Sequence, residues 1–462
     1  SNTGSTTVDG NVNAVNTKID STLIMTDGSN ISSIITRTGN LTLNGSSTVT
    51  GTVGNSTTSL GNINANGIAG KTVTFANDVY ATNIENTGTG ATTFQANVVA
   101  TNVNVNAGTS TFQDNLTAAT TTISTGTGNF NTVSGATTSD LRFTDNGTAN
   151  LNNGLTGNVT TTADNKGTLN LVGSNNQTVT GPVGASGASL AEVNAGANGS
   201  TSTFANDVYA TNTNIGSGRV DFNTVSGTTN TNIIFSDNGT ANLLNGLTGD
   251  INFAGKDATV NVSDGKGILG SVQTLASNNT GIINYQGDGT ISGNIGSSSH
   301  GIKELNINTA NQQNSGGPGL VIGYTALARE LYADVVNLRN NATLTLKDNV
   351  NLINTGSDNI LITVDNTNTG TLTFEGTSNI TGEVGQSNKV LNTINAGATG
   401  KTVTFDDMVY ASTLKYSDDG KVVLNGDNNS NASAEGMIGT VNFDNKASTL
   451  AIGDDVNLTV GA

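Results

Sequence analysis

The chain has 462 residues, of which only 11% are charged, and its 34 acidic and 17 basic side chains give a formal net charge of −17. Such an acidic chain lacks the basic face that nucleic-acid binding requires, and charge does not draw it to an anionic membrane. It contains no cysteine, which excludes disulfides and thiolate metal sites. Glycine, Asn, Thr and Ser replace the missing charge, and these residues favour turns and polar ladders over helix interiors.

Three copies of one long block recur along the chain, at residues 41–83, 169–212 and 372–413. Each block joins a T-G-x-V-G segment to a T-F segment followed by V-Y-A, as in GKTVTFANDVYATN at 70–83. The separation of the two segments is nearly constant, since their first glycines stand at 51 and 70, 181 and 199, and 382 and 400. Self-similarity of this kind indicates a repeat architecture.

Shorter repeats lie between the blocks. Phe75, Phe94 and Phe112 follow one another at almost equal intervals, and a second duplication relates 130–159 to 222–251. The region 252–340 is divergent and keeps only a weak match, SGNIG at 292–296. Within it, YTALARELYADVVN at 324–337 allows two interpretations. It is either a short helix or loop that projects, or a variant coil in which LYAD replaces VYAT.

These periods predict an all-β chain, a right-handed parallel β-helix (β-solenoid) with coils of about 18–20 residues that forms one solenoid over 1–462. In Thr72-Val73-Thr74-Phe75, Val73 and Phe75 would face the interior and the threonines the outside. Asn-Gly pairs would mark corners, because both residues tolerate a left-handed backbone. If stacked coils are equivalent, Phe75, Phe204 and Phe405 should be buried at equivalent places.

Few side chains are candidates for chemistry. His300 is the only histidine, which argues against a catalytic triad or a His-rich zinc site and favours a solvated turn residue. Acidic pairs could supply the carboxylates of a polysaccharide-active enzyme, but each stands in or beside an expected turn, where exposed corners are the favoured interpretation. The pairs are Asp406 with Asp407, Asp418 with Asp419, and Asp454 with Asp455.

Cofactor signatures are equally sparse. Asp and Asn turns leave room for weak Ca²⁺ binding, although neither the calcium β-roll repeat nor the EF-hand loop occurs. The glycine-rich string at 314–319 lacks the lysine of a phosphate loop. Tyr80, Tyr209 and Tyr410 recur at one repeat position, which favours packing over a sugar-stacking ladder. We therefore assign no catalytic, cofactor-binding or metal-binding residue and expect no enzyme activity.

The cadence of the blocks resembles the passenger domains of rickettsial surface-antigen autotransporters of the outer membrane protein B type. The resemblance is carried by TGPVG at 180–184 followed by SLAEVNAGANGSTSTFANDVYATN, and by TGEVG at 381–385 followed by VLNTINAGATGKTVTF. It implies a β-helical passenger at the cell surface, associated with the outer membrane through a barrel outside this chain. Since the polar segment from Ser1 onward does not resemble a signal peptide, we expect a passenger fragment or processed product.

The resemblance implies attachment to host cells and protection of the bacterial surface. The partners would be a host-cell surface protein or neighbouring copies of the chain, and the location extracellular. One alternative is a lattice protein of the S-layer type without a specific receptor. A third, less favoured, is a polysaccharide-active β-helix enzyme.

Overall fold

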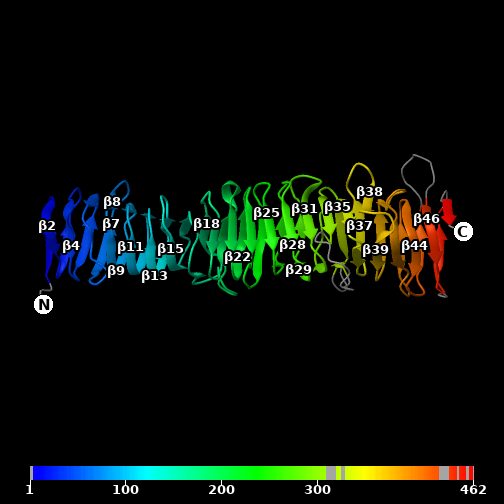
Figure 1. Cartoon of the computed structure of the whole chain (residues 1–462), viewed down its shortest axis with the longest axis horizontal. Coiled ribbons are helices and arrows are strands. Elements are labelled where there is room, and N and C mark those ends of the chain that lie inside the picture. Colours follow the sequence, from blue (N-terminus) through cyan, green and yellow to red (C-terminus); the bar gives the residue numbers. More distant parts are fainter. Residues whose placement is uncertain are drawn as a thin grey trace. The chain divides into compact units, whose positions relative to one another are not determined.

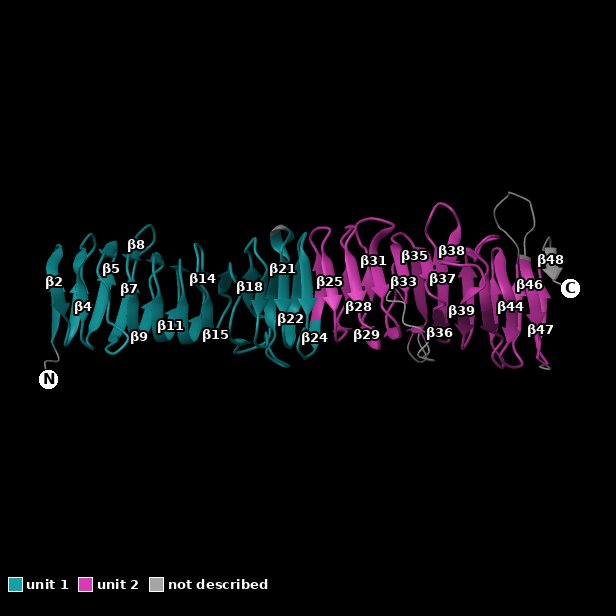
Figure 2. Ribbon diagram, viewed as in Figure 1, with its two compact units in different colours: residues 1–230 teal, residues 231–462 magenta. Residues whose placement is uncertain are grey.

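The computed structural model describes residues 4–308, 319–323, 328–425, 436–444, 447–453 and 457–460. Within these ranges the chain is all-β, and the one helical element is a single 3₁₀ turn, η1 (Ala197–Gly199). The chain divides into two compact units, residues 1–230 and 231–462 (Figure 2). Each unit is by itself a parallel β-solenoid, which confirms the predicted fold class.

One coil of the first unit shows how the sequence makes three sides. In β8 (Thr72–Phe75) Val73 and Phe75 are fully buried while the threonines point outward. The next strand, β9 (Val79–Asn86), changes the phase of its alternation midway, since Val79 and Ala81 are buried in its first half and Ile84 and Asn86 in its second. We call the sides formed by β8, the first half of β9 and the second half of β9 sides A, B and C.

Side A of the first unit is a parallel ladder in which each strand pairs with the strand one coil later. Figure 1 labels five of its strands, β2, β4, β8, β18 and β22. In chain order the ladder holds β2 (Val12–Lys18) and β4 (Ile31–Thr36), whose first halves contribute, then β6 (Ser47–Val49), β8, β10 (Ala91–Phe94), β12 (Thr109–Phe112), β14 (Thr127–Phe130), β16 (Thr148–Leu151), β18 (Lys166–Leu171), β20 (Leu190–Ala195) and β22 (Val208–Ile215).

Sides B and C follow the same rule. Side C comprises β1 (Ser5–Val8), β3 (Thr22–Met25), β5 (Asn40–Asn44), β7 (Leu60–Asn66), β9, β11 (Val98–Val105), β13 (Leu116–Ile123), β15 (Thr137–Phe143) and β17 (Val159–Thr161). Side B runs through Val53 and Val79, the first halves of β11, β13 and β15, and Leu155, then β19 (Gln177–Val179), β21 (Thr201–Phe204) and β23 (Arg219–Phe222).

The core of side A is a stack of aromatic rings. Phe75, Phe94, Phe112 and Phe130 lie in successive coils with ring centroids 5.0, 5.0 and 5.4 Å apart and ring planes only 6°, 5° and 3° from parallel. Adjacent strands of an open sheet are usually rotated by about 20–25°. The near-parallel rings therefore indicate that side A is nearly flat over these four coils.

Coil length varies more than the sequence predicts. The side-A partners Phe75, Phe94, Phe112 and Phe130 follow one another at the expected interval. In the long blocks, however, Val49 pairs directly with Phe75, and Val179 pairs directly with Phe204, so these coils are longer by several residues. The additional residues include a tight antiparallel turn, between Asn55 and Thr58 in the first block.

The predicted equivalence of the block phenylalanines is only half correct. Phe75, Phe204 and Phe405 are all buried, with exposed fractions of 0%, 1% and 1%. Phe75 lies in β8 on side A, whereas Phe204 lies in β21 on side B. Within the first unit, the T-F strand of the second block therefore occupies a different one of the three sides from the T-F strand of the first block. Any side accepts any strand whose inward residues are apolar, so a repeat can be displaced by a third of a turn without losing its core.

The second unit has the same construction. One ladder holds β25 (Thr240–Leu243), β28 (Thr259–Val262), β31 (Thr280–Tyr285), β33 (Ile302–Ile307), β35 (Arg329–Leu338), β38 (Ile360–Val364) and β41 (Glu383–Val384), followed by β44 (Val409–Tyr416), β46 (Gly436–Asn442) and β48 (Asn457–Val460). A second holds β24 (Thr229–Phe235), which begins in the first unit, β27 (Ile251–Asn252), β30 (Val272–Gln273), β37 (Val350–Asn354), β40 (Ser378–Thr381), β43 (Thr402–Phe405), β45 (Lys421–Leu424) and β47 (Thr449–Ile452).

The third ladder of this unit holds β26 (Leu247–Thr248), β29 (Lys266–Leu269), β32 (Gly289–Ile291), β34 (Leu320–Ile322), β36 (Thr343–Leu346), β39 (Thr369–Phe374) and β42 (Leu391–Ala396). Bent strands such as β35 and β44 contribute to two ladders each, as β9 does in the first unit.

The divergent region contains a fourth block. Ile295 bridges Leu331 as Val53 bridges Val79, and the backbone N–H of Tyr332 donates to Ile295 O at 2.7 Å, as that of Tyr80 donates to Val53 O. The described part of segment 324–337 is strand β35, which confirms the interpretation as a variant coil. Residues 324–327 of that segment lie outside the described residues. The sequence shows this block only through the weak match SGNIG and through LYAD in place of VYAT, because the block lacks the T-F segment of the other three.

Candidate functional surfaces

The outward-facing positions of the coils form ladders of asparagine side chains. On side A, Asn150, Asn170 and Asn194 each donate a side-chain N–H to the amide oxygen of the ladder residue one coil earlier, at 2.7 Å. A second ladder on side C joins Asn40, Asn62, Asn83 and Asn102 at 2.8–2.9 Å. Each amide in the middle of a ladder uses one N–H and one oxygen lone pair within it, so both groups keep capacity for another partner.

The second unit carries a similar ladder. Asn261, Asn284, Asn306 and Asn337 continue from Asn242 with donor–acceptor distances of 2.7–2.9 Å. The guanidinium of Arg339 also donates to Asn306 Oδ1, at 3.1 and 3.2 Å. Outward amide ladders are therefore a surface feature of both units, and the asparagine-rich composition favours such ladders without fixing their positions.

Four tight turns occupy equivalent places in the four blocks. Each closes with an antiparallel bridge, between Asn55 and Thr58, Ala185 and Ala188, Ser297 and His300, and Gln386 and Lys389. His300 is therefore a turn residue, as predicted, and its Nδ1 lies 2.9 Å from Ser299 Oγ. The four turns have the same backbone pairing but different side chains, because the last residue of the turn is Thr, Ala, His or Lys.

The recurrent tyrosines pack against these turns. A Cβ at Gly54, Gly184 or Gly385 would approach the carbonyl oxygen of Tyr80, Tyr209 or Tyr410 to within 2.3–2.4 Å. All three tyrosines are half-buried. Burial raises the pKa of the Tyr410 hydroxyl, and the nearby charge of Glu383 raises it further. These contacts involve the backbone and Cβ of each tyrosine, so packing of the tyrosine rings stays a prediction.

The acidic pairs do not converge on a common point. Asp406 accepts hydrogen bonds from Asn379 Nδ2 (2.8 Å), Thr381 Oγ1 (3.2 Å) and Asn425 Nδ2 (2.9 Å). Asp407 instead accepts from the backbone N–H of Gly382 at 2.7 Å and from Asn359 Nδ2 at 3.1 Å. Both are half-buried and join neighbouring coils, so the prediction of exposed corners is wrong for this pair.

The other two pairs differ. Asp418 and Asp419 are exposed in a turn, as predicted, and Asp419 accepts the backbone N–H of Ala447 at 2.8 Å. Asp454 and Asp455 lie outside the described residues, as do residues 314–318 of the glycine-rich string. Among the described residues, no three His, Cys, Asp or Glu side chains are grouped to hold a metal ion.

One acidic neighbourhood has an altered proton affinity. Desolvation raises the pKa of Asp334, and the charges of Asp358 and Glu304 raise it further, against an opposing effect of Lys303. Asp334 lies in the middle of β35, where it follows the tyrosine of the fourth block. Among the residues that the structure describes, no base or nucleophile forms a hydrogen bond with its carboxylate, and we assign it no chemistry.

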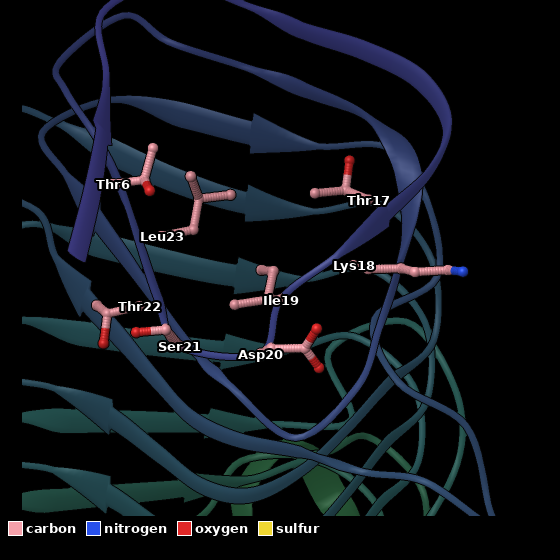
Figure 3. A pocket seen from close by; sticks show the side chains of 8 residues that line it. All are labelled: Thr6, Thr17, Lys18, Ile19, Asp20, Ser21, Thr22 and Leu23. Atoms are coloured by element: carbon pink, nitrogen blue, oxygen red, sulfur yellow. The ribbon is translucent and has the colours of Figure 1, made fainter. Parts of the chain in front are cut away.

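A cavity of about 310 Å³ lies at the first coils of the first unit, lined by Thr6 and residues 17–23. Figure 3 shows Leu23 and Ile19 between the strands, while the ammonium end of Lys18 extends away from them. The lining mixes aliphatic groups, hydroxyls and one carboxylate, Asp20, which pairs with Arg37 at 3.6 Å. This composition selects no particular ligand class.

Comparison with known proteins adds no assignment to this description. No family model matches the chain, and neither a curated protein nor a solved structure matches it. Within the described residues no helix is long and apolar enough to span a membrane. Any function must therefore be argued from the repeated surface of the solenoid.

Proposed function

We propose that this chain is a bacterial cell-surface coat protein that acts as an adhesin, displayed as the passenger of an autotransporter. The observation that carries the proposal is the outward surface of the coils, where neutral Thr and Asn positions repeat strand after strand. Such a surface offers many identical weak contacts, and many weak contacts acting together give strong attachment. The block motifs that resemble rickettsial passengers support the same conclusion.

The test is display of the chain on a bacterium that does not itself adhere. Cells displaying it should attach to cultured host cells, and mild protease treatment of the surface should remove the attachment. A matched strain displaying an unrelated β-solenoid of similar length controls for bulk and charge. Attachment equal in the two strains would contradict the adhesin part of the proposal.

A lattice protein of the S-layer type is the second candidate, and the flatness of side A is the observation that favours it. Flat neutral sides can approach one another without the repulsion that a chain of net charge −17 would otherwise feel. Purified protein at high concentration should then form ordered two-dimensional arrays in electron micrographs. Dispersed particles under all conditions, with and without Ca²⁺, would count against this candidate.

An enzyme acting on polysaccharide is the least supported candidate. Asp406 and Asp407 point to different partners, and both are engaged in hydrogen bonds between coils. The double substitution Asp406→Asn and Asp407→Asn should therefore lower the stability of the fold. We expect no glycan-degrading activity in the parent or in this variant. A glycan-degrading activity that disappears in this variant would revive the candidate.

A further inference from the structure

Side A of the first unit carries a regular array of threonines. We call the outward positions of β8, β10, β12, β14, β16 and β18 the threonine face, and residues 72–171 that contain it are all described. One column reads Thr72, Ala91, Thr109, Thr127, Thr148 and Thr168, and the other reads Thr74, Thr93, Thr111, Asn129, Asn150 and Asn170. None of these twelve positions is charged; β18 also turns Lys166 outward beside the last row, where its ammonium pairs with Asp145 at 2.8 Å.

The geometry of the array is that of a flat grid. Neighbouring strands lie about 4.8 Å apart, and alternate residues along a strand about 6.6 Å apart. The stacked phenylalanines beneath, with planes within 6° of parallel, keep the first four rows from twisting. Threonine is stiff at χ1, so repeated threonines on repeated backbone favour a common hydroxyl orientation.

The hydroxyls of the face are available to solvent. In the described structure the side chains of Thr72, Thr74, Thr93, Thr109, Thr127, Thr148 and Thr168 form no hydrogen bond with a protein atom, and Thr111 only accepts one, from Asn129 Nδ2 at 3.3 Å. Thr72 is exposed and the others are half-buried by their neighbours. Each row therefore presents hydroxyl groups beside methyl groups at fixed intervals.

From these observations we infer that the threonine face binds ice. Hydroxyls at fixed spacing can hold water molecules in register, and the methyl groups between them order the water that they contact. The spacing along a column is close to that of second-neighbour oxygens in hexagonal ice. A flat, neutral, rigid grid fits a crystalline surface of water, and the complete absence of aromatic side chains from the face disfavours a crystalline polysaccharide, for which ring stacking is the usual contact.

The test is partition of the full chain into slowly growing ice. The protein should enter the ice fraction in excess of an inert globular protein and should slow the recrystallisation of fine ice grains. The double variant Thr93→Lys with Thr109→Lys places two charges in the middle of the face and should lose both effects. Thr117→Lys makes the same kind of change at an exposed position of β13 on another side and should keep them.

Thermal melting of all variants shows whether the fold is retained, and Thr93→Val, which keeps shape and removes one hydroxyl, gives a folded alternative should the lysines unfold the chain. It is expected to partition less than the parent. The inference is overturned if the parent partitions no better than the inert protein, or if Thr93→Lys with Thr109→Lys partitions as well as the parent. It is also overturned if the parent is retained by chitin or cellulose powder and not by ice.

Discussion

Glycines at the block turns hold a backbone that other residues strain to adopt. Gly184 has φ +67° and lies where a Cβ would meet the carbonyl oxygen of Tyr209 at 2.3 Å. Gly187, later in the same turn, has φ +76° but open space around it. A side chain at Gly187 would therefore cause backbone strain alone, whereas a side chain at Gly184 would cause backbone strain and a steric clash.

We expect Gly187→Ala to destabilise the first unit by about 1 kcal/mol, because alanine is strained at positive φ. Gly184→Ala should cost at least about 2 kcal/mol more, since a close contact with fixed backbone cannot be relieved by a side-chain rotation. Chemical denaturation of both variants measures the difference. Equal destabilisation would show that the contact with Tyr209 does not constrain the turn.

Buried tyrosines make stability depend on alkaline pH. Tyr416 is almost fully buried, its hydroxyl donates to Thr449 O at 2.9 Å, and burial raises its pKa to about 12. Burial also raises the pKa of Tyr285. A group whose pKa is higher in the folded state stabilises the fold fully below its unfolded pKa, near 10 for tyrosine, and this contribution is lost as pH rises to the folded value.

The free energy of unfolding should therefore fall between about pH 10 and pH 12, and Tyr416→Phe should fall less steeply than the parent over that interval. Denaturation of the parent and of Tyr416→Phe at the same pH values measures the two free energies of unfolding. Any effect of lysine titration is common to both proteins and cancels in the difference. Parallel curves for parent and variant would contradict the assignment of this pH dependence to Tyr416.

At the scale of the strand, the outward asparagines couple coils that are far apart in sequence. Asn150 donates to Asn129 and accepts from Asn170, both at 2.7 Å. The side chain is half-buried, so each bond is partly shielded from water. Since stability in a solenoid is a sum over neighbouring coils, a broken rung should weaken the two adjacent interfaces and leave distant coils unchanged.

Asn150→Ala should lower the unfolding free energy by about 1–2 kcal/mol through the loss of two hydrogen bonds. Asn150→Asp keeps the acceptor for Asn170 but places a charged acceptor against Asn129 Oδ1, so at neutral pH it should be at least as destabilised as the alanine variant. Asn104→Ala is the control on side C, because its Nδ2 lies 3.5 Å from Glu85 and makes at best a weak bond. Hydrogen exchange should show the loss of protection in β14, β16 and β18; a uniform loss over the first unit would refute local coupling.

Strand identity and inward residues could be predicted because alternation of apolar and polar residues has a period of two, as in β8. Coil length could not be predicted from the sequence, because the residues of the 55–58 turn lengthen a coil without changing its inward-facing side chains. The side of the solenoid that each block occupies could not be predicted either, since Phe75 and Phe204 lie in the same local sequence but on different sides. The predicted Asn-Gly corners are only partly correct: in four of these pairs the glycine has a positive φ (Gly45, Gly154, Gly199 and Gly246), whereas the asparagines with positive φ, such as Asn131 and Asn165, lie outside Asn-Gly pairs.

At the scale of the whole chain, complete coils should be removable. Deletion of the segment 95–112 joins Phe94 to Gln113 and takes out one complete coil, because Phe94 and Phe112 are partners in adjacent strands. The flanking coils then meet with the same register of inward side chains, and only one interface is lost. We expect the shortened chain to keep its β-rich circular dichroism and a cooperative melt.

Deletion of the shorter segment 104–112 is the matched contrast. It removes half a coil, so the following strands reach the wrong sides and apolar residues become exposed to water. This variant should aggregate or melt at a markedly lower temperature. Comparable melts for the two deletions would mean that stacking in register does not govern stability here.

The offset between blocks also affects recognition from outside. The string FANDVYATN occurs at 75–83 and again at 204–212, and the two occurrences begin on different sides of the first unit. An antibody or receptor that bound the string would thus meet it in two orientations on one molecule. Such a protein would act as a cross-linker between partners arranged around its axis, and not as a surface that presents its epitope in a single direction.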